Sequence, residues 1–126
     1  MGYVVQHDPV AVEYMETCRK WIRILKALRT ENASLINSLA AALKGTVCRS
    51  FVDEAERFQL TILDREEILV LLRHEVIEQL EWLEKQTLER PSPYSYVTLK
   101  RDVEKMMMEC ESVRRAFLTF MTAVKA

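Results

Sequence analysis

The chain has 126 residues, of which 49% are hydrophobic and 29% are charged, which excludes a disordered protein and is typical of a folded domain. A formal net charge of -1 gives the chain as a whole no attraction for nucleic acid or for an anionic membrane. Two glycines and three prolines leave few points at which the chain can turn, so we expect a few long elements. We predict a single all-α domain over residues 1–126.

The first predicted helix runs from about residue 9 to residue 44. Asp8 can cap its free amides, and Pro9 fits a first helical turn, where an N–H is not needed. Asn32 lies on the apolar stripe of this helix in a stretch of weak helix formers, so a break there, giving a fourth helix, is the alternative. The apolar stripe consists of Val12, Met15, Cys18, Ile22, Leu25, Leu28, Leu35, Ile36, Leu39 and Leu43.

The second predicted helix covers about residues 48–89. Gly45 is expected to end the first helix as a left-handed residue, and the short connection makes the two helices antiparallel neighbours. Asp64 offers a second cap inside this helix, but the stripe passes it in register, which favours one continuous helix. Ile68, Leu71, Ile77 and Leu80 widen the apolar face, and Arg65 and Gln79 are polar residues on the stripe. The apolar stripe residues are Phe51, Ala55, Phe58, Ile62, Leu69, Leu72, Val76 and Leu83.

The segment Arg90-Pro91-Ser92-Pro93 must end the second helix, because two prolines remove backbone donors and restrict the residues before them. The third helix is predicted over about residues 96–125, and every residue of its stripe is apolar, which predicts burial. We therefore predict a long antiparallel three-helix bundle, coiled-coil-like and up-down-up in topology. The third stripe consists of Tyr96, Leu99, Val103, Met106, Cys110, Val113, Phe117, Phe120 and Val124.

Charge is distributed unequally among the three predicted helices. Residues 8–46 hold six basic and four acidic side chains, residues 48–90 hold six basic and eleven acidic ones, and residues 95–126 hold six and four. An acidic helix between two basic ones can pair its charges with both neighbours. The alternative is an anion or nucleic-acid site on the first helix, with Trp21 as a stacking group. Its candidate residues are Arg19, Lys20, Arg23, Lys26 and Arg29.

Motifs of catalytic and cofactor sites are missing from the sequence. There is no glycine-rich phosphate loop and no GxSxG turn, and two histidines cannot supply a bundle di-iron site. His74, Glu78 and Glu81 share a helical face, which favours a solvated His–Glu pair over a metal site. Three widely spaced cysteines indicate reduced thiols, with Cys18 and Cys110 on the apolar stripes. We predict no enzyme, no cofactor and no metal.

The start of the chain carries no Lys or Arg before residue 10, so it lacks the basic region of a secretory signal. Its apolar runs, such as residues 68–72, are far shorter than the ~20 residues that span a bilayer. We therefore expect a cytoplasmic protein with no membrane association.

The expected function is that of a non-enzymatic helical protein–protein interaction module, of an adaptor, chaperone-like or structural kind. Apolar residues of the second helix lie outside its main stripe, and such surface usually marks an interface. We expect them to form a homodimer, most simply with two-fold symmetry. The predicted interface residues are Leu60, Leu63, Val70, Leu80 and Trp82. Anion or nucleic-acid binding by the first helix is the alternative, and a small molecule inside the bundle is a third possibility.

Overall fold

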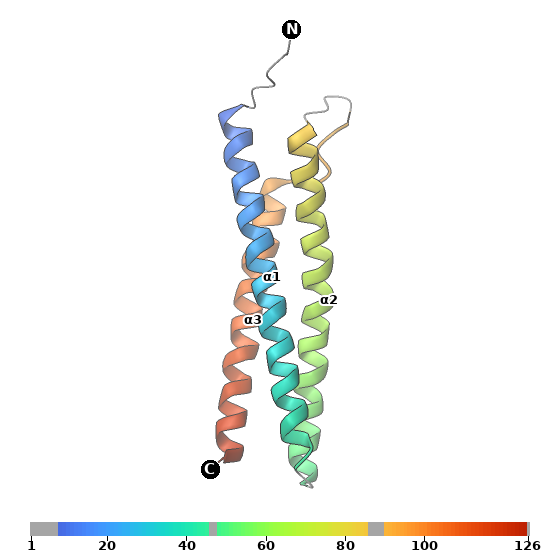
Figure 1. Cartoon of the computed structure of the whole chain (residues 1–126), viewed down its shortest axis with the longest axis vertical. Coiled ribbons are helices and arrows are strands. Elements are labelled where there is room, and N and C mark those ends of the chain that lie inside the picture. Colours follow the sequence, from blue (N-terminus) through green and yellow to red (C-terminus); the bar gives the residue numbers. More distant parts are fainter. Residues whose placement is uncertain (1–7, 46–47, 86–89, 126) are drawn as a thin grey trace.

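The computed structural model describes residues 8–45, 48–85 and 90–125, with side chains up to residue 123. These residues form three helices and no strand: α1 (Pro9–Leu43), α2 (Arg49–Lys85) and α3 (Tyr96–Lys125). The helices lie side by side, with α2 antiparallel to α1 and α3 (Figure 1). The predicted all-α, up-down-up three-helix bundle is thus confirmed. The predicted end of the second helix at residue 89 and the stripe residue Val124 lie outside the described residues and side chains.

Both ends of α1 follow from local chemistry. Asp8 is the N-cap, and its carboxylate accepts a hydrogen bond of 3.1 Å from the Val10 N–H. The prediction that Gly45 is a left-handed residue was wrong. Lys44 has right-handed helical angles, and the Gly45 N–H donates to the Ala42 carbonyl at 3.4 Å. The helix therefore ends on a tightened turn, which needs no positive φ.

Neither long helix is broken. α1 passes through Asn32 and α2 passes through Asp64, so the four-helix alternative was wrong. Asn32 is a weak helix former, but its side chain is buried between the helices. Tertiary packing of the stripe on both sides of Asn32 overrides its local propensity.

The core divides into two apolar clusters. The Trp21 cluster lies near the start of α1, and the Phe117 cluster lies near its end. The Trp21 cluster contains Met15, Cys18, Trp21, Leu25, Leu69, Leu72, Val76, Leu83, Leu99, Val103, Met106 and Cys110. The Phe117 cluster contains Leu35, Leu39, Phe51, Ala55, Ile62 and Phe117. Most of these residues belong to the predicted stripes.

Two predicted stripe residues are exposed, and one buried residue lies outside the predicted stripes. Val12 is 39% exposed and Tyr96 is 40% exposed, because both lie near a helix start where few neighbours cover them. Trp21, which the stripe of the first helix omits, is buried and takes the central position that Ile22 only partly fills. At this turn of α1 the buried position is therefore Trp21, one residue before the predicted Ile22.

A polar ring separates the two clusters at the middle of the bundle. Within the described residues, the ring has one ion pair across each helix–helix interface, with buried Asn32 beside them. The pairs are Arg29–Glu66 at 2.6 Å, Arg65–Glu109 at 3.1 Å and Glu31–Arg114 at 3.0 Å. Half-exposed pairs of this kind add little stability, but polar residues on an apolar seam specify register.

Gln79, the other polar residue on the second stripe, holds the connection between α2 and α3. Its side chain is fully buried, and its amide nitrogen donates to the Ser92 hydroxyl at 2.9 Å. Its amide oxygen accepts the Tyr94 N–H at 3.1 Å. The loop donors are thereby satisfied inside the bundle, where an unpaired N–H would be costly.

Phe117→Ala should lower the free energy of unfolding by ~3–5 kcal/mol, through lost transfer energy and the cavity that remains. The Phe117 ring is 2% exposed and meets the Phe58 ring edge to face at 5.7 Å. Urea unfolding followed by circular dichroism measures the change. Leu118→Ala, at the exposed neighbour, is the control and should shift stability by less than about 0.5 kcal/mol. Equal effects of the two substitutions would contradict the burial of this stripe.

Candidate docking surface

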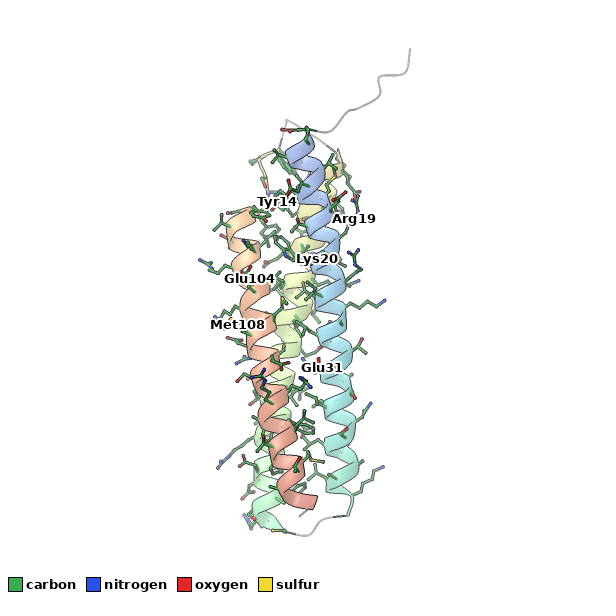
Figure 2. The ribbon with its side chains drawn as sticks, turned by 90° about the vertical axis from the view of Figure 1, so that its left-hand side faces the viewer. Tyr14, Arg19, Lys20, Glu31, Glu104 and Met108 are labelled. Carbon is green, nitrogen blue, oxygen red and sulfur yellow. The ribbon has the colours of Figure 1, made fainter. Side chains whose placement is uncertain are left out.

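Exposed apolar side chains concentrate on the middle of α2. Of the twelve large apolar residues exposed in the described part of the chain, five lie between residues 60 and 71. Leu60 is 65% exposed and Leu71 is 60% exposed. The others are scattered, such as Met108 on α3 (Figure 2). We call the five residues the outer strip of α2: Leu60, Leu63, Ile68, Val70 and Leu71.

The structure brings only part of the predicted interface together. Leu60, Leu63 and Val70 lie exposed on the outer strip. Leu80 and Trp82 are instead partly buried against the Trp21 cluster, and the Trp82 indole N–H donates to the Arg90 carbonyl at 2.9 Å. The sequence held a signal for Leu80, since it follows buried Val76 by four residues and so lies on the core side.

Four residues were predicted to widen the apolar face of the second helix. Ile77 and Leu80 are partly buried, as this predicts, but the interpretation was wrong for Ile68 and Leu71. Both side chains are exposed, because α1 and α3 cover only the opposite side of α2. The helical spacing could have shown this in advance. Ile68 and Leu71 each precede a stripe residue, Leu69 and Leu72, by one position, so they are rotated from the buried stripe by about 100°.

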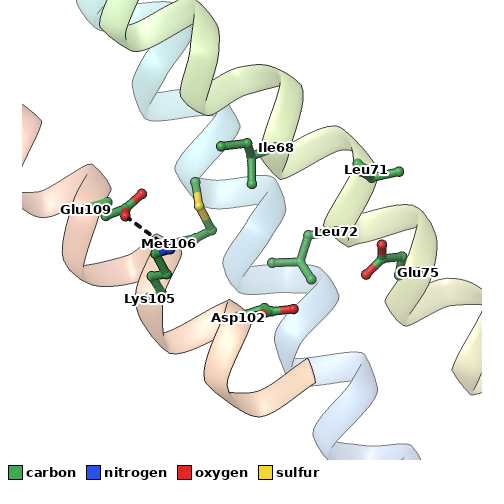
Figure 3. A pocket seen from close by; sticks show the side chains of 8 residues that line it. All are labelled: Ile68, Leu71, Leu72, Glu75, Asp102, Lys105, Met106 and Glu109. Carbon is green, nitrogen blue, oxygen red and sulfur yellow. Dashed lines mark ion pairs between the residues drawn. The ribbon is translucent and has the colours of Figure 1, made fainter. Parts of the chain in front are cut away.

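A groove of about 260 Å³ lies next to the outer strip, between α2 and α3. Figure 3 shows its side chains, with Glu75 and Asp102 at one end and the Lys105–Glu109 pair at the other. Its apolar lining comes from Ile68, Leu71, Leu72 and Met106. We call it the α2–α3 groove. Two of its apolar side chains, Ile68 and Leu71, also belong to the outer strip, so the two surfaces are continuous.

Acidic groups dominate the end of the groove at Glu75. Partial burial raises the pKa of the Glu75 carboxyl, and the nearby Asp102 and Glu78 carboxylates raise it further, while His74 lowers it. Glu109 differs, since Arg65 and Lys105 both pair with it, at 3.1 and 3.9 Å. Among the ion pairs of the described residues none includes Glu75. This end of the groove thus holds repelling carboxylates beside an apolar floor.

The basic residues of α1 are split by the fold. Arg29 turns to α2 and pairs with Glu66, and Arg19 lies 3.5 Å from Glu84. Lys20, Arg23 and Lys26 are exposed; Arg19 and Lys20 project from α1 in Figure 2. The predicted stacking role of Trp21 was wrong, because its ring is in the core. The alternative anion patch is therefore a solvated helix face without an aromatic platform.

The predicted His–Glu pair is present, with His74 Nε2 2.6 Å from a Glu78 carboxylate oxygen. In the part of the chain that the structure describes, no three His, Cys, Asp or Glu side chains gather as metal ligands would. All three cysteines are free, and burial raises the pKa of the Cys18 thiol to about 11. Cys18 and Cys110 lie in the core as predicted, and Cys48 is exposed.

Comparison with known proteins gives no relative: no family model, no curated protein and no solved structure matches this chain. None of the helices in the described ranges has an apolar stretch of the length and purity needed to cross a bilayer. The function proposed for the chain rests on its own side chains and their geometry.

Glu75→Gln should raise the free energy of unfolding at neutral pH, by less than about 1 kcal/mol, because it removes a charge that is partly buried and is repelled by Asp102 and Glu78. Since the folded pKa of Glu75 is raised above its ordinary value near 4.5, the folded state binds the proton more tightly than the unfolded state. The contribution of Glu75 to stability therefore falls as pH rises from its ordinary pKa to its raised pKa in the folded chain.

Urea midpoints measured from pH 4 to pH 8 test this expectation. The wild type should lose stability relative to Glu75→Gln across that window, and the difference should then stay constant at higher pH. Glu67→Gln, on the exposed face of the same helix, is the control. Identical pH profiles for the two variants would contradict a raised pKa of Glu75 in the folded chain.

Proposed function

We propose that this chain is a non-enzymatic protein–protein interaction module that binds a helix of another protein. The binding surface is the outer strip of α2 together with the α2–α3 groove. The observation that carries the proposal is the concentration of exposed apolar side chains between residues 60 and 71. Large apolar side chains gathered in one exposed region are costly in water and usually mark an interaction site.

The shape of this surface suits a helix. The five residues of the outer strip lie on one helix, with Leu63 toward α1 and Ile68 toward α3. Residues 60 to 71 extend over about 16 Å at 1.5 Å per residue. The neighbouring groove has an apolar floor, which includes Leu72 and Met106, and charged rims. An amphipathic helix recognises a surface of this kind through apolar side chains three and four residues apart.

A second copy of the chain is the occupant that the sequence predicts, and the charges of the strip oppose it. A two-fold antiparallel contact that places Leu60 opposite Leu71 of a second copy also places Leu63 opposite Ile68. The same register sets Asp64 opposite Glu67, twice across the axis. Like charges directly opposed destabilise a helix contact, so a different protein fits the strip better.

Analytical ultracentrifugation at micromolar concentration decides between these occupants. We expect a monomer at neutral pH, because the two Asp64–Glu67 contacts would repel. A stable dimer that Leu60→Ser with Leu71→Ser abolishes would instead make a second copy the occupant. A dimer that these substitutions leave intact would place self-association elsewhere, and Trp82→Ala tests the predicted location near residue 82.

The alternative function, anion or nucleic-acid binding by α1, is supported by the exposed Lys20, Arg23 and Lys26. This face has three solvated cations and no aromatic side chain on which a base could stack. It therefore supports nucleic-acid binding less strongly than the exposed apolar surface of α2 supports protein binding. The two functions respond differently to salt: phosphate contacts weaken steeply as salt rises, whereas apolar docking does not.

Selection from a displayed library of helical peptides without charge bias tests the proposed function. Peptides selected on the wild-type chain should bind the Leu60→Ser, Leu71→Ser variant at least about tenfold more weakly, because its outer strip has lost its most exposed leucines. Val97→Ser with Met108→Ser is the matched control, since it removes two exposed apolar side chains from α3. Peptides that bind both variants alike, or a library that yields no binder, would refute the function.

A further inference from the structure

We propose that the occupant of the α2–α3 groove is a basic amphipathic helix of another protein. Its apolar side chains would pack on Ile68, Leu71 and Met106, and a Lys or Arg would lie between Glu75 and Asp102. This inference rests on the proposed function and adds the chemistry of the partner.

The apolar part of the argument comes from the floor of the groove. Leu72 and Met106 are buried and form a continuous apolar base between the helices, while Ile68 and Leu71 stand exposed beside it. A partner that covers these two exposed side chains removes apolar area from water without displacing any part of the bundle. The floor fixes where the apolar stripe of the partner would lie.

The charge of the partner follows from the acids around the groove, which outnumber the cations that pair with them. Glu75 and Asp102 face each other at the end of the groove, and Asp64 and Glu67 flank the exposed leucines of α2. The nearby bases are already engaged, since Arg65 and Lys105 both pair with Glu109. Arg101, 3.6 Å from Asp102, is largely exposed. A cation held between Glu75 and Asp102 would relieve their repulsion.

No described helix of the chain itself presents a face that is apolar and basic without acids. On α3, exposed Val97, Arg101 and Met108 share their face with the acid Glu104. The outer face of α2 has the apolar side chains but the same negative charge as the groove. The exposed face of α1 has the cations Lys20, Arg23 and Lys26 but no large apolar side chain among them. Nucleic acids and anionic lipids would be repelled by the carboxylates. The groove therefore selects for a segment that is both apolar and basic, contributed by a different protein.

Two synthetic peptides provide the probe. Both are about 18 residues long, enough to form a helix on binding, with the same leucine positions, and the remaining positions are lysine in one and glutamate in the other. Titration of the isotope-labelled chain, followed by amide chemical shifts, reports affinity and location together. We expect the leucine–lysine peptide to shift the amides of Ile68, Leu71 and Met106, and to bind at least about tenfold more tightly than the leucine–glutamate peptide.

Charge reversal at the groove separates a specific contact from general attraction. Glu75→Lys with Asp102→Lys should lower the affinity for the leucine–lysine peptide at least about tenfold and raise the affinity for the leucine–glutamate peptide. The control, Glu16→Lys with Glu104→Lys, changes the net charge equally at exposed acids outside the groove. It should change either affinity by less than about threefold. If the reversed groove does not fold, Glu75→Gln with Asp102→Asn should give a smaller loss in the same direction.

Equal binding of the two peptides, or equal responses of the groove and control variants, would overturn the inference. If neither peptide shifts the groove while library-selected peptides still depend on the outer strip, the inference fails and the proposed function stands. If the selected peptides also ignore the strip, the proposed function fails as well.

Discussion

The polar ring at the middle of the bundle is the constraint on which the rest of the structure depends. Apolar stripes of three long helices can slide past one another by a heptad and still bury leucine on leucine. Within the described residues one ion pair crosses each of the three interfaces near Asn32, so a slip of any helix breaks at least two of them. Their gain in stability is small, but the register they select determines which residues of α2 and α3 lie opposite each other along the groove.

The excess acid on α2 is only partly used in pairs between helices. The charge pattern of the sequence predicted that acids of the second helix pair with bases of both neighbours, and Arg29–Glu66 and Arg19–Glu84 do so with α1. The pair with α3 has the opposite polarity, since Arg65 belongs to α2 and Glu109 to α3. Acids on the far side of the helix, such as Asp64 and Glu67, have no neighbouring helix to pair with. They lie among the exposed leucines, and this combination of apolar and acidic side chains gives the surface its proposed preference for a basic helix.

The three helices and most of the core were predictable, because burial of a long helix requires a repeat that is visible in the sequence. Three details were not. Asn32 needed the packing around it to decide between a break and a buried polar residue. Gly45 can end a helix in more than one way. Only part of the outer strip was predicted. Ile68 and Leu71 face solvent and Leu80 faces the core, and this depends on how much of the circumference of α2 is covered by α1 and α3.

Thiol labelling at two adjacent positions tests most directly whether this face of α2 is open in the isolated chain. In a Cys48→Ser background, whose remaining thiols Cys18 and Cys110 are buried, Leu71→Cys and Leu72→Cys are compared. Leu71 is 60% exposed and Leu72 is 4% exposed, so the first thiol should react at the rate of a free thiol and the second at least about 100-fold more slowly. Equally slow reaction of both would show that the face is already covered and would contradict this account.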